Sequence, residues 1–196
     1  MSETSSSTNQ AGSSVSEAGG STNQAGSPTN GPPEPLLDLP AHRFLDERRV
    51  PYEKLSFPPE TKKGAANVAQ ALGYNESQMV KTLVFETGSG EHVLVMLGGG
   101  KNAVSGNLKR AIGSRDIRLA APDRVIEVTG YAIGSIPPFH WQPPGFRNFI
   151  DACLMEEDLL GVGAGVWGQE IMIAPKVLAG VTGAKVVDLS STQLSK

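Results

Sequence analysis

The sequence is poor in cysteine and has no long apolar segment. Its single cysteine, Cys153, excludes an intramolecular disulfide framework and a metal site built from cysteines. The longest apolar stretches, such as residues 93–97, have the length of a strand and are too short to cross a bilayer. The first residues show no basic start followed by an apolar run, so no signal peptide is expected. These absences favour a soluble, cytoplasmic protein with no membrane partner.

The formal net charge of −3 is spread unevenly along the chain. Residues 39–118 hold 12 basic and 8 acidic side chains, whereas residues 119–196 hold 5 and 8. A mildly positive part of the protein would suit brief contact with the phosphates of a nucleic acid. An ordinary mixed surface explains the same counts equally well.

Residues 1–35 consist mainly of Ser, Thr, Asn, Gln, Gly and Pro. They contain the heptapeptide Ser-Thr-Asn-Gln-Ala-Gly-Ser twice, at 7–13 and 21–27, and neither copy has an apolar face. Such a segment cannot bury enough apolar surface to offset its loss of entropy on ordering. We therefore predict a disordered, low-complexity tail over residues 1–35 and one domain over residues 36–196.

Periodicity and turn residues within the domain predict helices and strands that do not alternate regularly. Helices are expected at residues 41–50, 64–72, 105–112, from Pro122, and from Pro175 to Gly180. Strands are expected at residues 52–57, 80–87, 91–97, 117–120, 148–154, 169–173 and 184–189. Gly88-Ser89-Gly90 is typical of a hairpin turn, and Ser105 is expected to cap the helix that follows it. The pattern predicts an α+β domain with a mixed sheet.

Three familiar kinds of site are not supported by the spacing of their residues. The three histidines, His42, His92 and His140, show no spacing typical of metal ligands, and we interpret them as core or surface residues. Gly98-Gly99-Gly100-Lys101 lacks the earlier glycine and the following Ser or Thr of a phosphate loop. Ser105 lacks the first glycine of a nucleophile elbow.

The segment from Gly163 to Gly168 matches the dinucleotide-binding pattern G-x-G-x-x-G. That pattern needs a helix directly after it, because the pyrophosphate binds at a helix N-terminus. Here residues 169–174 read as a strand, so a glycine-rich turn is the preferred interpretation. Nucleotide binding stays open only as a distant alternative.

Two features could carry chemistry. Lys81 shares a strand face with Leu83 and Phe85. Placing an ammonium on an apolar face costs free energy unless an anion or a carbonyl binds it there. The alternative is a lysine at the start of a strand whose ammonium extends to water. The segment from Gly130 to Phe139 combines glycines, which allow close backbone approach, with the stiff pair Pro137-Pro138. It could present backbone N–H groups to a carbonyl oxygen, or it could be a tight connection.

Taken together and in order, three segments resemble the YbaK/EbsC family of aminoacyl-tRNA deacylases, which is also found with bacterial prolyl-tRNA synthetases. The segments are residues 80–85, residues 134–139, and the run from Gly163 through residues 171–175 to residues 183–188. The resemblance spans roughly residues 40–190. It implies a mixed, mainly antiparallel sheet with flanking helices, and hydrolysis of the ester between a wrong amino acid and the terminal adenosine of tRNA.

The resemblance also implies roles for particular residues. Lys81 would hold a substrate carbonyl or phosphate with Thr82 beside it, Gly134 would bind the ester through its backbone, and Pro138 would close the pocket. The remaining substrate-binding residues that it implies are Gly130, Ser135, Gly163 and Glu170. No metal and no dissociable cofactor are expected.

Some positions depart from the family pattern. Ser135 stands where a second glycine is frequent, and His140 where a glycine is common. Bacterial cysteinyl-tRNA deacylases have a serine and a basic pair before the late strand, where this chain has Gly163 and Val166-Trp167, with Glu170 as the later acid. These differences leave open which amino acid the protein would remove from tRNA.

The sequence thus predicts a free-standing trans-editing deacylase. Its expected partner is the acceptor end of a mischarged tRNA of the proline type, and an aminoacyl-tRNA synthetase is a further candidate partner. A non-catalytic module of the same fold that binds tRNA or a synthetase is the alternative.

Overall fold

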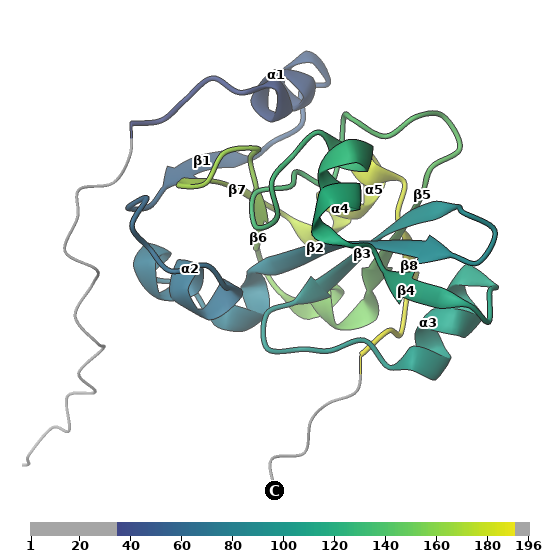
Figure 1. The fold of residues 1–196 in the computed structure, drawn as a ribbon. Coiled ribbons are helices and arrows are strands. Elements are labelled where there is room, and N and C mark those ends of the chain that lie inside the picture. Colours follow the sequence, from purple (N-terminus) through teal and green to yellow (C-terminus); the bar gives the residue numbers. More distant parts are fainter. Residues whose placement is uncertain (1–34, 191–196) are drawn as a thin grey trace, which may run out of the picture.

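The computed structural model describes residues 35–190. The predicted tail, residues 1–35, lies outside this range apart from Pro35, and so do residues 191–196. The first described residues are held by Gln169, whose side chain donates to the Pro35 carbonyl at 3.0 Å and accepts the Leu37 N–H at 3.1 Å. Figure 1 shows the arrangement of the elements.

The helices and strands form a mixed α+β fold with mainly antiparallel sheets, as the sequence predicted. The α-helices are α1 (Pro40–Glu47), α2 (Ala65–Leu72), α3 (Ser105–Ile112), α4 (Pro122–Thr129) and α5 (Pro175–Thr182). The short 3₁₀ helices are η1 (Glu76–Gln78) and η2 (Ala152–Glu156). The strands are β1 (Glu53–Ser56), β2 (Val80–Thr87), β3 (His92–Gly98), β4 (Ile117–Leu119), β5 (Arg147–Asp151), β6 (Leu160–Gly163), β7 (Gln169–Ile173) and β8 (Lys185–Val187).

The larger sheet has five strands in the order β4-β2-β3-β5-β8. Strand β2 pairs antiparallel with β3 and β4, while β3, β5 and β8 run parallel. Both faces of β3 are buried. Val93, Val95 and Leu97 pack with α3, whereas Leu94 and Met96 pack toward α5 and the smaller sheet. This explains why β3 is apolar throughout rather than alternating.

The smaller sheet is antiparallel, with the order β1-β7-β6. In Figure 1 it lies toward α1 and α2, and the larger sheet lies toward α3. The two sheets meet where Met79, just before β2, forms a parallel bridge with Gly161 of β6. The N-terminal end of β2 is thereby set against the β6–β7 hairpin.

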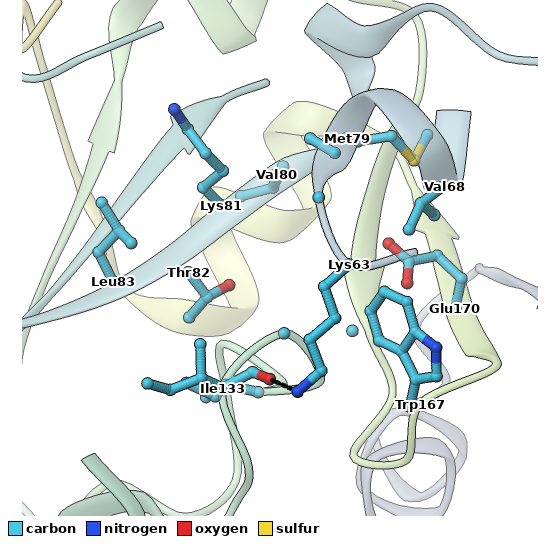
Figure 2. Close-up of a pocket in the computed structure, with 15 residues that line it drawn as sticks. Lys63, Val68, Met79, Val80, Lys81, Thr82, Leu83, Ile133, Trp167 and Glu170 are labelled. Carbon is cyan, nitrogen blue, oxygen red and sulfur yellow. Dashed lines mark hydrogen bonds between the residues drawn. The ribbon is translucent and has the colours of Figure 1, made fainter. Parts of the chain in front are cut away.

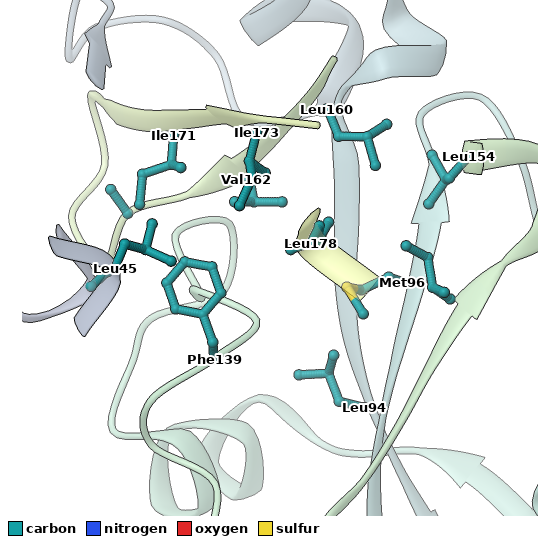
Figure 3. Packing of buried hydrophobic residues seen from close by; sticks show 13 residues of the cluster. Leu45, Leu94, Met96, Phe139, Leu154, Leu160, Val162, Ile171, Ile173 and Leu178 are labelled. Atoms are coloured by element: carbon teal, nitrogen blue, oxygen red, sulfur yellow. The ribbon is translucent and has the colours of Figure 1, made fainter. Parts of the chain in front are cut away.

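The main core fills the space between the two sheets and is shown in Figure 3. It combines side chains from α1, β3, β5, β6, β7 and α5 with Phe139 from the loop after α4, and its largest fully buried members include Leu45, Leu94, Met96, Phe139, Ile150, Leu160 and Ile171. Burying each such side chain stabilises the fold by about 1.5–3 kcal/mol. Phe139 is thus an anchor for the segment that precedes it.

Three local expectations are wrong. The chain forms β6 at residues 160–163, where no strand was predicted, because pairing with β7 rather than β propensity makes Leu-Gly-Val-Gly a strand. Residues 152–156 form a 3₁₀ helix instead of the end of a strand. Ser105 is the first residue of α3, not its cap; Val104 takes the cap position and no side chain caps the helix.

The turn after β5 is stabilised by the buried carboxylate of Asp151, which is 2% exposed. Its Oδ1 accepts the backbone N–H groups of Leu189 at 3.0 Å and Ser190 at 3.4 Å, and its Oδ2 accepts the Ser190 hydroxyl and the Cys153 thiol. Burial alone would raise the pKa of Asp151, but these hydrogen bonds outweigh it and lower the pKa.

We predict that Asp151→Asn lowers the free energy of unfolding by about 1.5–3 kcal/mol at pH 7, because hydrogen bonds to a charged acceptor are lost. The folded-state pKa of Asp151 lies below its unfolded value of about 3.9. Its contribution is therefore complete above that pH and is lost as the pH falls through the folded-state pKa. Urea denaturation at pH 7 and pH 3 should show a difference between the two proteins that shrinks in acid.

The exposed Asp188 provides the control, since Asp188→Asn should change stability little at either pH. An Asp151→Asn protein as stable as the wild type at pH 7 would contradict this assignment.

Candidate functional site

A cavity of about 230 Å³ lies where the two sheets meet (Figure 2). Its walls come from the start of α2, the start of β2, the loop after α4 and the β6–β7 hairpin. The residues that line it are Lys63, Gly64, Ala65, Val68, Met79, Val80, Lys81, Thr82, Leu83, Ile133, Gly134, Ile136, Gly163, Trp167 and Glu170. Most of this lining is apolar, and five of the residues implied by the resemblance are among them: Lys81, Thr82, Gly134, Gly163 and Glu170.

Gly134 lies at the edge of the cavity in a turn that its neighbours hold in place. Its φ of +97° is in a region that glycine adopts readily and other residues rarely do. The Ser135 N–H and hydroxyl both donate to the Ala132 carbonyl, at 3.2 and 3.1 Å. Next to the turn, Lys63 Nζ donates to the Ile133 carbonyl at 3.1 Å. The backbone of Gly134 is therefore exposed to the cavity in a fixed turn.

Trp167 forms one wall of the cavity. Its indole N–H donates to the Pro59 carbonyl at 3.1 Å, and its ring meets Phe57 edge-on at 5.0 Å between centroids. A Cβ placed on Gly134 would lie 3.4 Å from the indole, and Lys63 Nζ lies 5.9 Å from its centroid. These contacts fix the width of the cavity beside Gly134.

Glu170 extends from β7 into the apolar part of the cavity, among Val68, Met79 and Trp167 (Figure 2). Its side chain accepts no hydrogen bond and forms no ion pair within residues 35–190, and the residue is 7% exposed. Burial raises the pKa of Glu170 to about 8. The carboxyl is consequently neutral around pH 7.

Thr82 also lines this site, and its side chain carries an unsatisfied polar group. Thr82 is paired with Met96, and residues directly opposite in an antiparallel pair point to the same side of the sheet. Its side chain therefore faces the smaller sheet. Its buried hydroxyl has no hydrogen-bond partner in the part of the chain that the structure describes.

Lys81 points to the other side of β2, as Figure 2 shows. It is paired with Leu97 and shares its face with Leu83 and Phe85, as predicted from alternation. Its ammonium donates to the Lys101 carbonyl, and burial lowers the pKa of Lys81. Lys81 lines the cavity without bringing its ammonium to the Gly134 turn.

The lysine at the Gly134 turn is Lys63, which sequence reasoning missed. Lys62 and Lys63 stand in the connection between β1 and α2, where charged residues are ordinary and no periodicity marks them. Only its hydrogen bond to Ile133, 70 residues along the chain, reveals that Lys63 borders the cavity.

Three residues implied by the resemblance lie outside the cavity lining. Gly130 ends α4 with a φ of +76° and has no atom within 4 Å of the position of a Cβ. The Ser135 hydroxyl is used within its own turn. Pro138 is buried and its carbonyl accepts the Gln142 side chain at 2.8 Å, so the cavity is bordered by Ile133 and Ile136 instead.

The glycines from Gly163 to Gly168 connect two antiparallel strands, β6 and β7. No helix follows them before α5, so the geometry required for pyrophosphate is absent and the dinucleotide interpretation is rejected. Within residues 35–190, no three His, Cys, Asp or Glu side chains gather where they could hold a metal ion. In the same range, no helix is long and apolar enough to cross a membrane.

Comparison with known proteins places the chain in a family. Residues 59–180 match the aminoacyl-tRNA editing domain, and the chain belongs to this family. The family predicted from the three sequence segments is thereby confirmed.

Individual relatives are distant. The chain is 23% identical to EbsC of Enterococcus faecalis, described as a candidate Cys-tRNA(Pro)/Cys-tRNA(Cys) deacylase, over 78% of this chain and 93% of that protein. It is 31% identical to the multifunctional Ser/Thr-tRNA deacylase ProXp-y of Escherichia coli K12, over 54% of this chain and 65% of that protein. A crystal structure of a candidate trans-editing enzyme for prolyl tRNA synthetase superposes with a TM-score of 0.68 at 30% identity, over 78% of this chain and 98% of that one.

Gly163 of β6 packs tightly against the loop after α4. A Cβ at residue 163 would lie 2.7 Å from the backbone carbon of Ser135. We predict that Gly163→Ala lowers the free energy of unfolding by about 1–3 kcal/mol, because the loop after α4 must move away from β6. Denaturant unfolding measures this change.

Gly106 in α3 is the matched control, since nothing lies within 4 Å of its Cβ position and its φ is not positive. Gly106→Ala should leave stability unchanged or raise it by about 0.5–1 kcal/mol. Equal stability of the two variants would show that the contact between Gly163 and Ser135 is not tight.

Proposed function

We propose that this protein hydrolyses the ester between a wrong amino acid and the terminal adenosine of a tRNA, acting in trans. One observation carries the proposal: in a member of the editing family, the open backbone of Gly134 and the unsatisfied hydroxyl of Thr82 line one small, largely apolar cavity. Preorganised donors in a small, largely apolar cavity suit a reaction in which charge develops on a carbonyl oxygen.

In the proposed reaction, water attacks the carbonyl carbon of the ester. The carbonyl oxygen gains negative charge and is stabilised by the backbone N–H at Gly134 and by Thr82. The bond to the ribose oxygen then breaks, the ribose oxygen takes up a proton, and the free amino acid leaves. Every mischarged tRNA presents the same ester and adenosine, so these groups would act on all substrates alike.

The nucleotide end of the substrate is proposed to enter beside Lys63, which is exposed and lines the cavity, and near its exposed neighbour Lys62. Lysine binds phosphate as a point charge, which suits an acceptor end read without regard to sequence. A proline-type tRNA is our proposal for the substrate, supported by the likeness to a structure described as trans-editing for prolyl tRNA synthetase.

Two lysines are candidates for contact with the ester or its neighbouring phosphate. The resemblance implies Lys81, and the geometry adds Lys63. We predict that Lys81→Ala lowers single-turnover hydrolysis of every mischarged tRNA at least about tenfold, because a hydrogen bond to a charged group contributes about 1.5–3 kcal/mol. The melting temperature should stay nearly unchanged, because the lost partner is the Lys101 carbonyl and not a buried carboxylate.

Lys176→Ala, at an exposed position in α5, is the control. Testing Lys63→Ala in parallel shows which lysine the reaction uses. If Lys81→Ala unfolds the protein or hydrolyses at the wild-type rate, Lys81 is structural.

Gly134→Val tests the turn itself. A side chain at residue 134 would approach Trp167 and obstruct the backbone, and losing one backbone donor typically costs on the order of a hundredfold in rate. We predict a loss of about that size on two or more mischarged tRNAs, measured by single-turnover ester hydrolysis.

Gly145→Val carries the same kind of backbone strain, at a φ of +84°, but in open space away from the cavity. It should lower stability without a comparable loss of rate. A folded Gly134→Val protein with wild-type rates would show that the turn is only a connection. Wild-type protein that binds mischarged tRNA without releasing amino acid would instead be a binding module.

A further inference from the structure

The carboxyl of Glu170 is a polar group in an apolar environment. It is 7% exposed, and its labelled neighbours in Figure 2 are Val68, Met79 and Trp167. On the opposite strand, a Cβ at Gly161 would lie 3.2 Å from Glu170 Oε1, which leaves no space for a polar side chain there. Nothing within residues 35–190 donates to the carboxyl or accepts from it.

The charged side chains facing this cavity do not supply a partner. Besides Glu170, the charged residues that line it are Lys63 and Lys81. Lys63 Nζ donates to the Ile133 carbonyl, and the Lys81 ammonium donates to the Lys101 carbonyl on the other side of β2. Burial, with no cation beside it, raises the pKa of Glu170 to about 8. At pH 7 Glu170 is a carboxylic acid that can donate one hydrogen bond and accept others.

The position of Glu170 relative to Gly134 defines which part of a bound substrate Glu170 can contact. The two residues line the same cavity, and Trp167, whose ring would lie 3.4 Å from a Cβ at Gly134, is also beside Glu170 in Figure 2. An ester held at Gly134 therefore places its aminoacyl group toward Glu170. The volume of about 230 Å³ lies below the range of about 300–1,000 Å³ usual for small-molecule sites, so only a small side chain fits.

We propose that Glu170 recognises a hydroxyl group on the aminoacyl side chain, so that the site selects serine or threonine over alanine or valine. This inference rests on the proposed deacylase function. A hydroxyl donates and accepts, as a neutral carboxylic acid does, so the two can satisfy each other. An aliphatic side chain would leave the Glu170 carboxyl buried and unpaired.

The α-ammonium of the substrate is a poorer partner for Glu170. An ammonium would have to be desolvated beside Val68 and Met79, and it would need Glu170 to ionise in the same apolar environment. It is also common to all aminoacyl groups, so it could not confer selectivity. A site built to bind a hydroxyl, by contrast, rejects analogues that lack it by up to about 10⁴–10⁵-fold.

The test uses the full chain and one tRNA charged in turn with serine, threonine, alanine or valine. Single-turnover hydrolysis should be at least about tenfold faster for the serine ester than for the alanine ester. This is well below the largest selectivity known for sites that bind a substrate hydroxyl. Glu170→Gln, which keeps a donor and an acceptor at the same size, should retain most of this preference. Glu170→Met, which removes both, should abolish the preference, so that the serine and alanine esters are hydrolysed at equal rates.

A binding measurement separates this inference from the proposed function. Adenosine analogues with serine or alanine joined by an amide cannot be hydrolysed, and wild-type protein should bind the seryl analogue more tightly by a similar factor. If no amino acid is released from any tRNA, the proposed deacylase function is wrong. The ratio of the affinities for the two analogues would still test the role of Glu170. Equal affinity of the wild-type protein for the two analogues, or an unchanged preference for the seryl analogue in Glu170→Met, would overturn the role of Glu170.

Discussion

The cavity depends on two close contacts between glycines of β6 and the chain on either side of it. A Cβ at Gly161 would lie 2.7 Å from the sulfur of Met79, and a Cβ at Gly163 would meet the backbone of Ser135 at the same distance. The first contact seats the start of β2 against the smaller sheet, and the second seats the loop after α4. Because Gly161 and Gly163 have no side chains, these two segments come close enough to β6 to enclose a small cavity.

The cavity concentrates desolvated polar groups that a purely structural core would avoid. The Thr82 hydroxyl has no partner among the described residues, and the Glu170 carboxyl is held neutral by burial. Unpaired polar groups of this kind each cost about 1–3 kcal/mol of stability. Protein cores seldom retain them without function, because a ligand that completes their hydrogen bonds recovers the cost.

The two faces of β2 lie in different environments, and Lys81 is on the face that does not carry Thr82. Thr82 faces the cavity with Met96 beside it, whereas Lys81 lies with Leu97 on the side that packs toward α3. Lys63 reaches the cavity from a different element altogether. Lys81 and Thr82 therefore lie on opposite faces of one strand, and the position of Lys63 beside the Gly134 turn is set by how the connection before α2 packs against Ile133.

Much of the fold followed from local physical chemistry. Two β-branched runs around Gly88-Ser89-Gly90 specify the β2–β3 hairpin, and Pro122 and Pro175 mark helix starts, because each signal acts through its own backbone dihedrals and hydrogen bonds. The resemblance of three separated segments was also a property of sequence alone, and it led to the family. Strand β6 could not be predicted, since its Leu-Gly-Val-Gly is a strand only where Met79 and Ser135 pack on it.

The site likewise divides between sequence and tertiary structure. Alternation along β2 determined which face Lys81 shares with Leu83, because side-chain direction in a strand has a period of two. Only the packing of the two sheets decided that Lys63 borders the Gly134 turn and that Glu170 ends in an apolar cavity. Burial and the position of a partner far along the chain arise from the whole fold, and they set the charge of Glu170.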